Sequence, residues 1–149
     1  NVRRLVDKDV LAFFWSPNGR YIAYLTLADQ VHPRLDDDVP PRIVGGYAAG
    51  QPVPQPRDIE ELWLELHLLD VDQGQHRLLT LFQPNALFVN QFMPYFDQYA
   101  LSHPLWSPDS QALVLPVIAH NQELIVIMPI NGLPPLPIAE GIMATWRPT

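Results

Sequence analysis

Side chains that could bind a cation or a charged partner gather in one stretch of the first half of the chain. Three consecutive carboxylates could hold a hard cation such as Ca²⁺, but they lack the alternating spacing and turn glycine of a calcium loop. A solvated acidic loop is the simpler interpretation, so we predict no metal site and no cofactor. The stretch is instead a candidate partner-binding loop, with the residues Arg34, Asp36, Asp37, Asp38 and Arg42.

The residues that could act as nucleophiles or bases are few and scattered. None of the serines lies in a Gly-x-Ser-x-Gly turn, and the neighbours Ser102 and His103 do not make a triad by adjacency alone. Cysteine is absent, and the histidines form no pair at i and i+4 spacing. The sequence therefore predicts a chain without catalytic residues. The serines are Ser16, Ser102, Ser107 and Ser110.

Composition limits the classes of partner. The chain has 149 residues and a net charge of −7, with Lys8 as its single lysine, so binding of nucleic acid is not expected. No stretch reaches the roughly 18 apolar residues of a membrane-spanning helix. A hydrophobic fraction of 48% supports a real core, whereas 17 prolines argue against long helices.

The elements that would position any site belong to a repeat. Trp15-Ser16-Pro17-Asn18-Gly19 recurs as Trp106-Ser107-Pro108-Asp109-Ser110, and Trp146-Arg147-Pro148 begins a third copy. Proline followed by Asn or Asp is typical of a tight turn between two strands, because proline presets φ and the Asx side chain binds its own backbone. We expect the tryptophans to pack as wedges between sheets. The repeat-defining structural residues are Trp15, Pro17, Asn18, Gly19, Trp106, Pro108, Asp109 and Trp146.

The repeat spacing indicates two insertions. Trp146 follows Trp106 by 40 residues, close to the ~40–45 residues of a four-stranded propeller blade. Trp106 follows Trp15 by 91 residues, which is more than one blade needs. Gly74 matches the turn glycine Gly132 of the second repeat, so part of the extra length lies before Gly74 and part after it. The proline-rich segment Ala28–Glu61 is predicted to be irregular, and Pro84 could open a short helix that Pro94 breaks.

These observations predict an all-β fold: a partial β-propeller with two four-stranded antiparallel blades and single strands from flanking blades. Residues 1–149 form a single domain in this interpretation. Residues 2–82 hold the first repeat, with a preceding outer strand and the 28–61 insertion. Residues 83–140 hold an aromatic connection and the second repeat, and 141–149 start a third. The predicted strands are Val2–Val6, Leu11–Trp15, Tyr21–Leu27, Leu62–Val71, His76–Phe82, Pro104–Trp106, Ala112–Ile118, Glu123–Ile130, Leu136–Ala139 and Gly141–Trp146.

Several parts of the sequence resemble the TolB-like, or PD40, β-propeller repeat. They are the Trp-Ser-Pro turn, the strand Ile22-Ala23-Tyr24, and Leu68–Gly74 followed by Arg77–Thr80. The resemblance covers about two repeats. The second departs from the pattern at Ser110, where glycine is expected, and at Pro129, where aspartate is usual. The family implies a propeller and slightly favours a periplasmic or extracytoplasmic location, and its members include Tol-system proteins, scaffolds and propeller domains of serine peptidases.

Two principal functions remain open. The first is a non-catalytic propeller segment that acts as a protein-interaction or scaffold module, as a fragment of a larger protein. The alternative is part of the gating propeller of a prolyl-oligopeptidase-type serine peptidase whose catalytic domain lies outside this sequence. A Gly-x-Ser-x-Gly motif downstream in the parent reading frame would favour the second. A calcium- or carbohydrate-binding surface ranks third.

Two blades cannot close a propeller, which needs about four to eight. The tryptophan-bearing face of each terminal sheet is therefore expected to stay uncovered. Exposed apolar faces and unpaired strand edges are sites of association. The sequence thus predicts a homo-oligomer of the isolated fragment, most simply a symmetric dimer.

Overall fold

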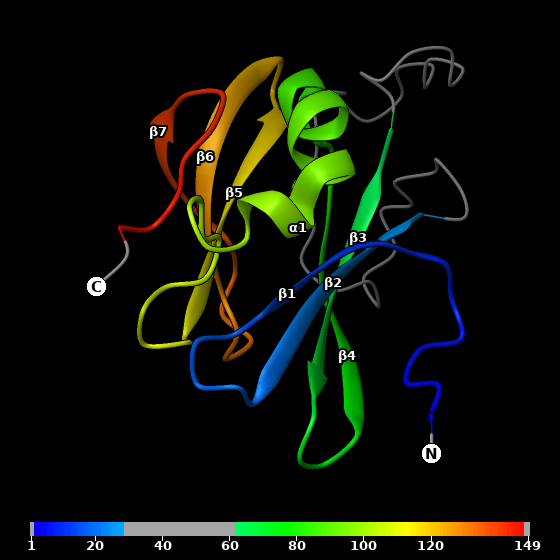
Figure 1. The fold of residues 1–149 in the computed structure, drawn as a ribbon. Helices are drawn as coiled ribbons and strands as arrows, with labels where there is room; N and C mark the ends of the chain where they lie inside the picture. The colour runs from blue at the N-terminus through cyan, green and yellow to red at the C-terminus, as the bar shows by residue number, and fades with distance from the viewer. Residues whose placement is uncertain (1, 29–61, 148–149) are drawn as a thin grey trace.

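The chain folds into two antiparallel β-sheets, in a computed structural model that describes residues 2–28 and 62–147 (Figure 1). The first sheet has the strand order β1-β2-β3-β4, and the second has the order β5-β6-β7. The strands are β1 (Val10–Trp15), β2 (Tyr21–Leu27), β3 (Leu64–Asp70), β4 (Gln75–Phe82), β5 (Ala112–Ala119), β6 (Gln122–Pro129) and β7 (Leu136–Glu140). The predicted all-β fold is confirmed.

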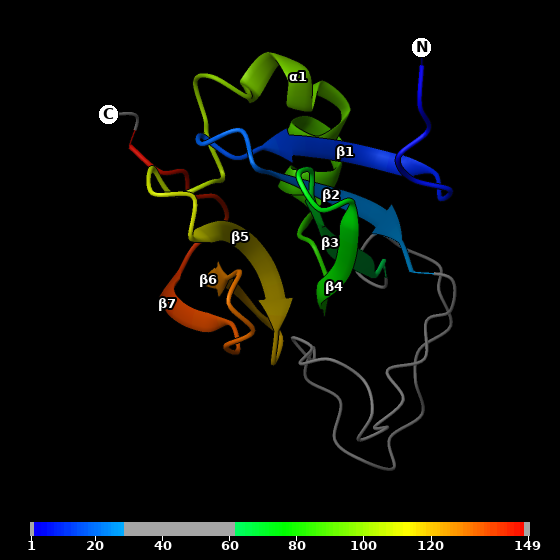
Figure 2. The same ribbon diagram turned by 90° about the horizontal axis from the view of Figure 1, so that it is seen from below.

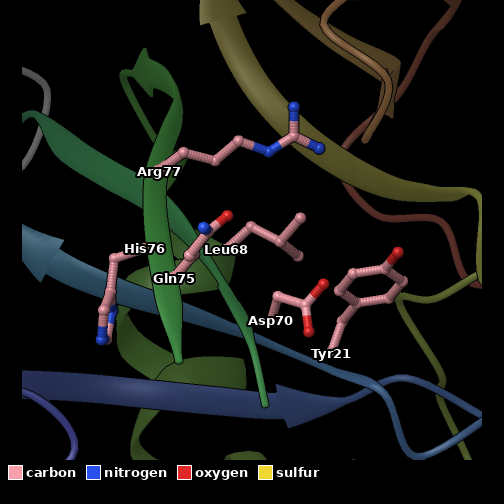
Figure 3. Close-up of a pocket in the computed structure, with 6 residues that line it drawn as sticks. All are labelled: Tyr21, Leu68, Asp70, Gln75, His76 and Arg77. Atoms are coloured by element: carbon pink, nitrogen blue, oxygen red, sulfur yellow. The ribbon is translucent and has the colours of Figure 1, made fainter. Parts of the chain in front are cut away.

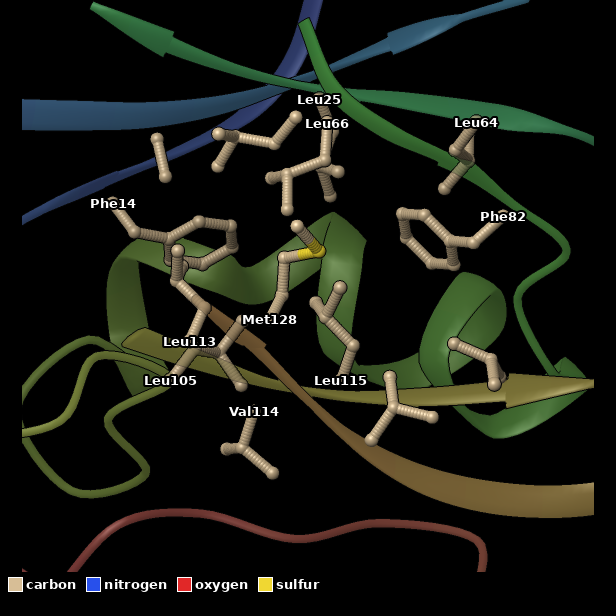
Figure 4. Close-up of a cluster of buried hydrophobic side chains, with 14 of the residues drawn as sticks. Phe14, Leu25, Leu64, Leu66, Phe82, Leu105, Leu113, Val114, Leu115 and Met128 are labelled. Atoms are coloured by element: carbon tan, nitrogen blue, oxygen red, sulfur yellow. The ribbon is translucent and has the colours of Figure 1, made fainter. Parts of the chain in front are cut away.

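Alternation of apolar and polar side chains decides which face of the first sheet is buried. In β3, Leu64, Leu66 and Leu68 are buried, whereas Glu65 and His67 are only partly covered on the opposite face. Strand β5 is apolar throughout instead, and its residues 113–117 are all buried. Figure 4 shows Leu64 and Leu66 facing Leu113 and Leu115 between the two sheets, with Met128 among them. One hydrophobic core therefore joins the two repeats.

The aromatic connection between the sheets is helical. A π-helical turn (Phe88–Phe92), a 3₁₀ turn (Met93–Tyr95) and α1 (Phe96–Tyr99) follow one another, and Phe88 and Phe92 enter the core. The prediction that Pro94 breaks this helix is wrong, because Pro94 lies at the start of the 3₁₀ turn, where no backbone donor is needed. Within the described residues, no helix is long and apolar enough to span a membrane.

Both Trp-Ser-Pro turns have the predicted side-chain chemistry. In the first turn, Ser16 Oγ donates to Asn18 Oδ1 over 2.7 Å, and the same Oδ1 accepts the backbone N–H of Arg20 over 3.0 Å. In the second, Ser107 Oγ donates to Asp109 Oδ1 over 2.6 Å. Individual hydrogen bonds therefore confirm the predicted turns. The first turn fixes the register of β1 with β2.

Three predicted strands do not form ladders. The second sheet has three strands rather than four, because Pro104–Trp106 contributes a single bridge, from Trp106 to Leu113. Val2–Val6 and Gly141–Trp146 are not strands either. In the first of these segments, Arg4 Nε donates to the carbonyl of Val6. Either segment could form a strand only if a neighbouring strand were there to pair with it.

Ser110 stands where the first repeat has glycine, and its side chain makes a contact that glycine could not. Its φ of 60° lies in the left-handed region, and its buried Oγ accepts the backbone N–H of Asn18 over 3.1 Å. The hydroxyl thus connects the turns of the two repeats, at the cost of backbone strain.

We expect Ser110→Ala to lower the free energy of unfolding by about 1 kcal/mol, because the strain stays and the hydrogen bond is lost. Ser110→Gly loses the same bond but removes the strain, so it should be close to neutral. Urea unfolding of the two variants tests this. Equal stability of the two variants would show that the positive φ is not strained.

Candidate functional site

An apolar groove of about 570 Å³ lies beside β1, on the side away from β2. Three of its residues are large and exposed: Phe13 is 45% exposed, Trp15 is 53% exposed and Leu101 is 92% exposed. A hollow of this size, with mainly apolar walls and a few polar groups, is typical of a binding site. Its walls are Phe13, Phe14, Trp15, Pro17, Phe96, Asp97, Ala100, Leu101, His103, Pro104, Leu105, Trp106, Pro108 and Arg147.

Three segments that are distant in sequence line this groove. They are β1 with the start of its turn (13–17), the continuous stretch 96–108 from the helix end to the second Trp-Ser-Pro turn, and Arg147. Phe96 fixes the helix end against the strand, since its ring packs on Phe13 at 5.1 Å and on Phe14 at 6.0 Å between centroids. Figure 2 shows this helical segment lying along β1.

The three repeat tryptophans, which we expected to share one packing role, differ in environment. Trp106 is 3% exposed, stacks on Tyr21 and donates its Nε1–H to the carbonyl of Phe14 over 2.9 Å. Trp15 is exposed, so its predicted place in a core is wrong; the face on which it lies is covered elsewhere, since Ile22 and Tyr24 are buried there and Val6 packs against them. Trp146 packs against the core, but its Nε1 is buried with no hydrogen-bond partner among the described residues.

His103 lines the groove and contacts its neighbour Ser102. Ser102 Oγ and His103 Nδ1 are 2.7 Å apart, and the imidazole also packs edge-on against Tyr99. A nucleophile needs a base that a third group orients. In the described part of the chain, no carboxylate hydrogen-bonds to His103, so this pair lacks the third member of a triad.

A smaller polar hollow of about 320 Å³ lies at the turn end of β3 and β4. Figure 3 shows Arg77 extending toward the second sheet, whereas His76 points to the other side of β4. Asp70 in this hollow is already paired, since its carboxylate lies 3.1 Å from the guanidinium of Arg20. The hollow therefore offers fewer free groups for a ligand than its polar lining suggests.

The face of the first sheet turned away from the core carries a cluster of titratable side chains that sequence analysis missed. Glu65 Oε2 lies 2.9 Å from His67 Nε2, 3.0 Å from Lys8 Nζ and 3.0 Å from Thr26 Oγ1. Tyr24 stacks on His67 at 4.9 Å. The period-two alternation of β3 placed Glu65 and His67 on one face, but their partners come from β2 and from the segment before β1 and could not be found from spacing.

Burial and hydrogen bonding shift the pKa values in this cluster. Burial alone would raise the pKa of Glu65, but hydrogen bonds from its three partners outweigh it and hold the pKa below its ordinary value. Burial lowers the pKa of His67 more than the hydrogen bond to Glu65 raises it. Burial, followed by the charge of Glu65, raises the pKa of Tyr24. His67 is therefore neutral near pH 7.

Stability should consequently fall as the solution is acidified. Unfolded His67 gains its proton near about pH 6.5, whereas folded His67 resists it, so the unfolded state binds more protons below that pH. Glu65 adds a second loss of stability below about pH 4.3, where the unfolded carboxyl is protonated first.

We expect His67→Gln to flatten the decline in stability between neutral and mildly acidic pH in urea unfolding experiments. His120→Asn is the control, since His120 is exposed; equal slopes for wild type and His67→Gln would contradict the assignment.

The residues predicted from sequence to bind a partner cannot be placed relative to these sites. Arg34, Asp36, Asp37, Asp38 and Arg42 lie outside the described residues. In residues 2–28 and 62–147, no group of three or more His, Cys, Asp or Glu side chains is arranged to hold a metal ion. The groove itself was missed, because its walls meet only in three dimensions. A usable signal was that β1 is apolar on both faces, which leaves Phe13 and Trp15 outside the core.

Comparison with known proteins finds likenesses among solved structures and none among sequences. No family model matches the chain, and no curated protein matches its sequence. The structure is similar to the crystal structure of TolB from Acinetobacter baumannii, with 14% identity and a TM-score of 0.47. The match covers 91% of this chain and 23% of that protein. The all-β fold stands on the two sheets themselves.

Proposed function

We propose that this chain is a non-catalytic β-propeller segment that serves as a protein-interaction module, and that the groove beside β1 is its contact surface. The observation that carries the proposal is the gathering of exposed Phe13, Trp15 and Leu101 around one apolar groove. A contiguous exposed apolar surface often marks a protein-binding site, whereas single exposed apolar residues are common on any protein. The repeat resemblance further favours an extracytoplasmic setting for this role.

The form of the groove supports a protein segment as its ligand. Among the described residues, β1 pairs with a strand, β2, on one side only. An edge strand offers backbone donors and acceptors wherever no other segment covers it. An extended segment can add to such an edge through main-chain hydrogen bonds, while alternate side chains enter the neighbouring groove. The rim carries both Asp97 and Arg147, so it can accept polar side chains of either sign.

A photo-crosslinking amino acid at position 101 tests this proposal in cells that carry the parent gene. Leu101 lines the groove and is largely exposed, so the probe should leave the fold intact and capture a defined protein. The same probe at Leu133, which is 58% exposed and does not line the groove, is the matched control. Adducts of equal pattern at both positions, or none at Leu101, would contradict the proposal.

A further inference from the structure

Two turns of the chain contain asparagine followed by glycine, a pair that is prone to spontaneous loss of ammonia. They are Asn18-Gly19 in the first Trp-Ser-Pro turn and Asn131-Gly132 after β6. Glycine has no side chain to hinder the approach of its backbone nitrogen to the carboxamide before it. All four residues are exposed, so water reaches both pairs. Sequence and exposure alone would therefore predict equal reactivity at the two turns.

Hydrogen bonds restrain the first pair. The Gly19 N–H donates to the carbonyl of Ser16 over 3.0 Å. Asn18 Oδ1 accepts the Ser16 hydroxyl over 2.7 Å and the backbone N–H of Arg20 over 3.0 Å. A backbone nitrogen attacks only after it has lost its proton, and the carbonyl oxygen that accepts this N–H would repel the resulting anion. Several hydrogen bonds must therefore break before Asn18 can react.

The second pair is held by fewer contacts. Among the described residues, the Gly132 N–H has no hydrogen-bond partner. Asn131 Oδ1 accepts one bond, from the backbone N–H of Leu133 over 3.1 Å. This bond draws electron density from the carboxamide, which makes Cγ a better electrophile. The Gly132 nitrogen can thus lose its proton to solvent and attack without breaking a bond of its own.

We propose that Asn131 is a site of spontaneous covalent modification, with the Gly132 nitrogen as nucleophile and water as co-reactant. The nitrogen forms a bond to Asn131 Cγ, the bond from Cγ to Nδ2 breaks, and ammonia leaves with the proton that the backbone nitrogen lost. Water then opens the cyclic imide at either of its carbonyl carbons. The products are aspartate and isoaspartate, and both add negative charge to the turn.

The two products should affect the turn between β6 and β7 differently. Aspartate fits a turn of this kind, because Asp109 Oδ1 accepts the backbone N–H of Gln111 just as Asn18 Oδ1 accepts that of Arg20. Isoaspartate instead adds a carbon to the main chain. The register that pairs Ile127 with Leu136 begins directly after this turn, so isoaspartate should loosen β7.

Peptide mapping by mass spectrometry after incubation of the folded chain at neutral pH tests the proposal. Asn131 should be converted at least about tenfold faster than Asn18, because more hydrogen bonds must break at Asn18. Aspartate and isoaspartate forms of the Asn131 peptide should both appear and separate by chromatography. In strong urea, where the turns are lost, the two rates should converge.

Ser16→Ala removes the hydroxyl that binds Asn18 Oδ1, so it should speed the conversion of Asn18 and leave that of Asn131 unchanged. Circular dichroism checks that this variant is folded. Ser107→Ala is the matched control, because Ser107 holds Asp109 in the equivalent turn and should not alter either rate.

Three results for the wild-type chain would each overturn the inference, even if Ser16→Ala does not fold. They are equal conversion of the two asparagines in the folded state, a rate ratio that urea leaves unchanged, and aspartate without isoaspartate at position 131. Neither Asn131 nor Gly132 lines the groove beside β1, so these results leave the proposed function untouched.

Discussion

Replacing Trp106 with alanine is expected to destabilise the fold by about 3 to 5 kcal/mol, the usual cost of removing a buried aromatic side chain. Trp106 packs between the sheets, stacks on Tyr21 and supplies the hydrogen bond to the Phe14 carbonyl. Its loss leaves a cavity between the two repeats and an acceptor without its donor. Urea unfolding followed by circular dichroism measures the effect.

The matched control is Trp15→Ala, at the same position of the other repeat. Because Trp15 is 53% exposed, the change should cost at most about 1 kcal/mol. Trp106→Phe keeps an aromatic side chain but loses the N–H and part of the packed volume, so it should cost less than alanine and more than zero. Similar costs at Trp15 and Trp106 would contradict the packing described for the repeats.

Asn85→Ala should be the second most damaging change, with an expected cost of about 2 to 4 kcal/mol. Asn85 is fully buried, its Nδ2 donates to the carbonyl of Ile142 over 2.7 Å, and its Oδ1 accepts the backbone N–H of Phe88 over 2.9 Å. The side chain therefore ties the start of the helical connection to the C-terminal segment. Alanine leaves both backbone groups without their partner in a buried place.

Asn90→Ala is the control for this change, because Asn90 is exposed in the same helical connection. Its cost should stay within about 0.5 kcal/mol. The two variants can be compared by urea unfolding together with limited proteolysis of the C-terminal segment. Faster cleavage in Asn85→Ala alone is expected, and equal cleavage of both variants would argue against the tie.

Local sequence patterns were sufficient for the first sheet and for the turns. The Trp-Ser-Pro-Asn/Asp pattern encodes a turn whose hydrogen bonds form within a few residues, so Asn18 and Asp109 behave alike despite different surroundings. Gly74 and Gly132 both adopt positive φ, as expected of turn glycines at matching places in the two repeats. These features depend on neighbours along the chain, which a sequence displays directly.

Features that depend on a neighbouring sheet could not be predicted in the same way. Trp15 and Trp106 have the same local sequence, but only Trp106 has another sheet against which to pack. Val2–Val6 has strand-like composition, yet a strand forms only where another strand supplies donors and acceptors. The cluster around Glu65 likewise joins residues from three segments, so neither its contacts nor its pKa shifts follow from spacing.

The central claim is that the groove beside β1 is the surface through which this chain binds a protein, and hydroxyl-radical footprinting tests it most directly. The protein is oxidised at low concentration, alone and with the partner captured at position 101, and mass spectrometry follows each side chain. We expect Phe13, Trp15 and Leu101 to be oxidised in the free chain and protected in the complex, while exposed Leu133 reacts equally in both. Protection elsewhere, with these three side chains as reactive in the complex as in the free chain, would contradict the account.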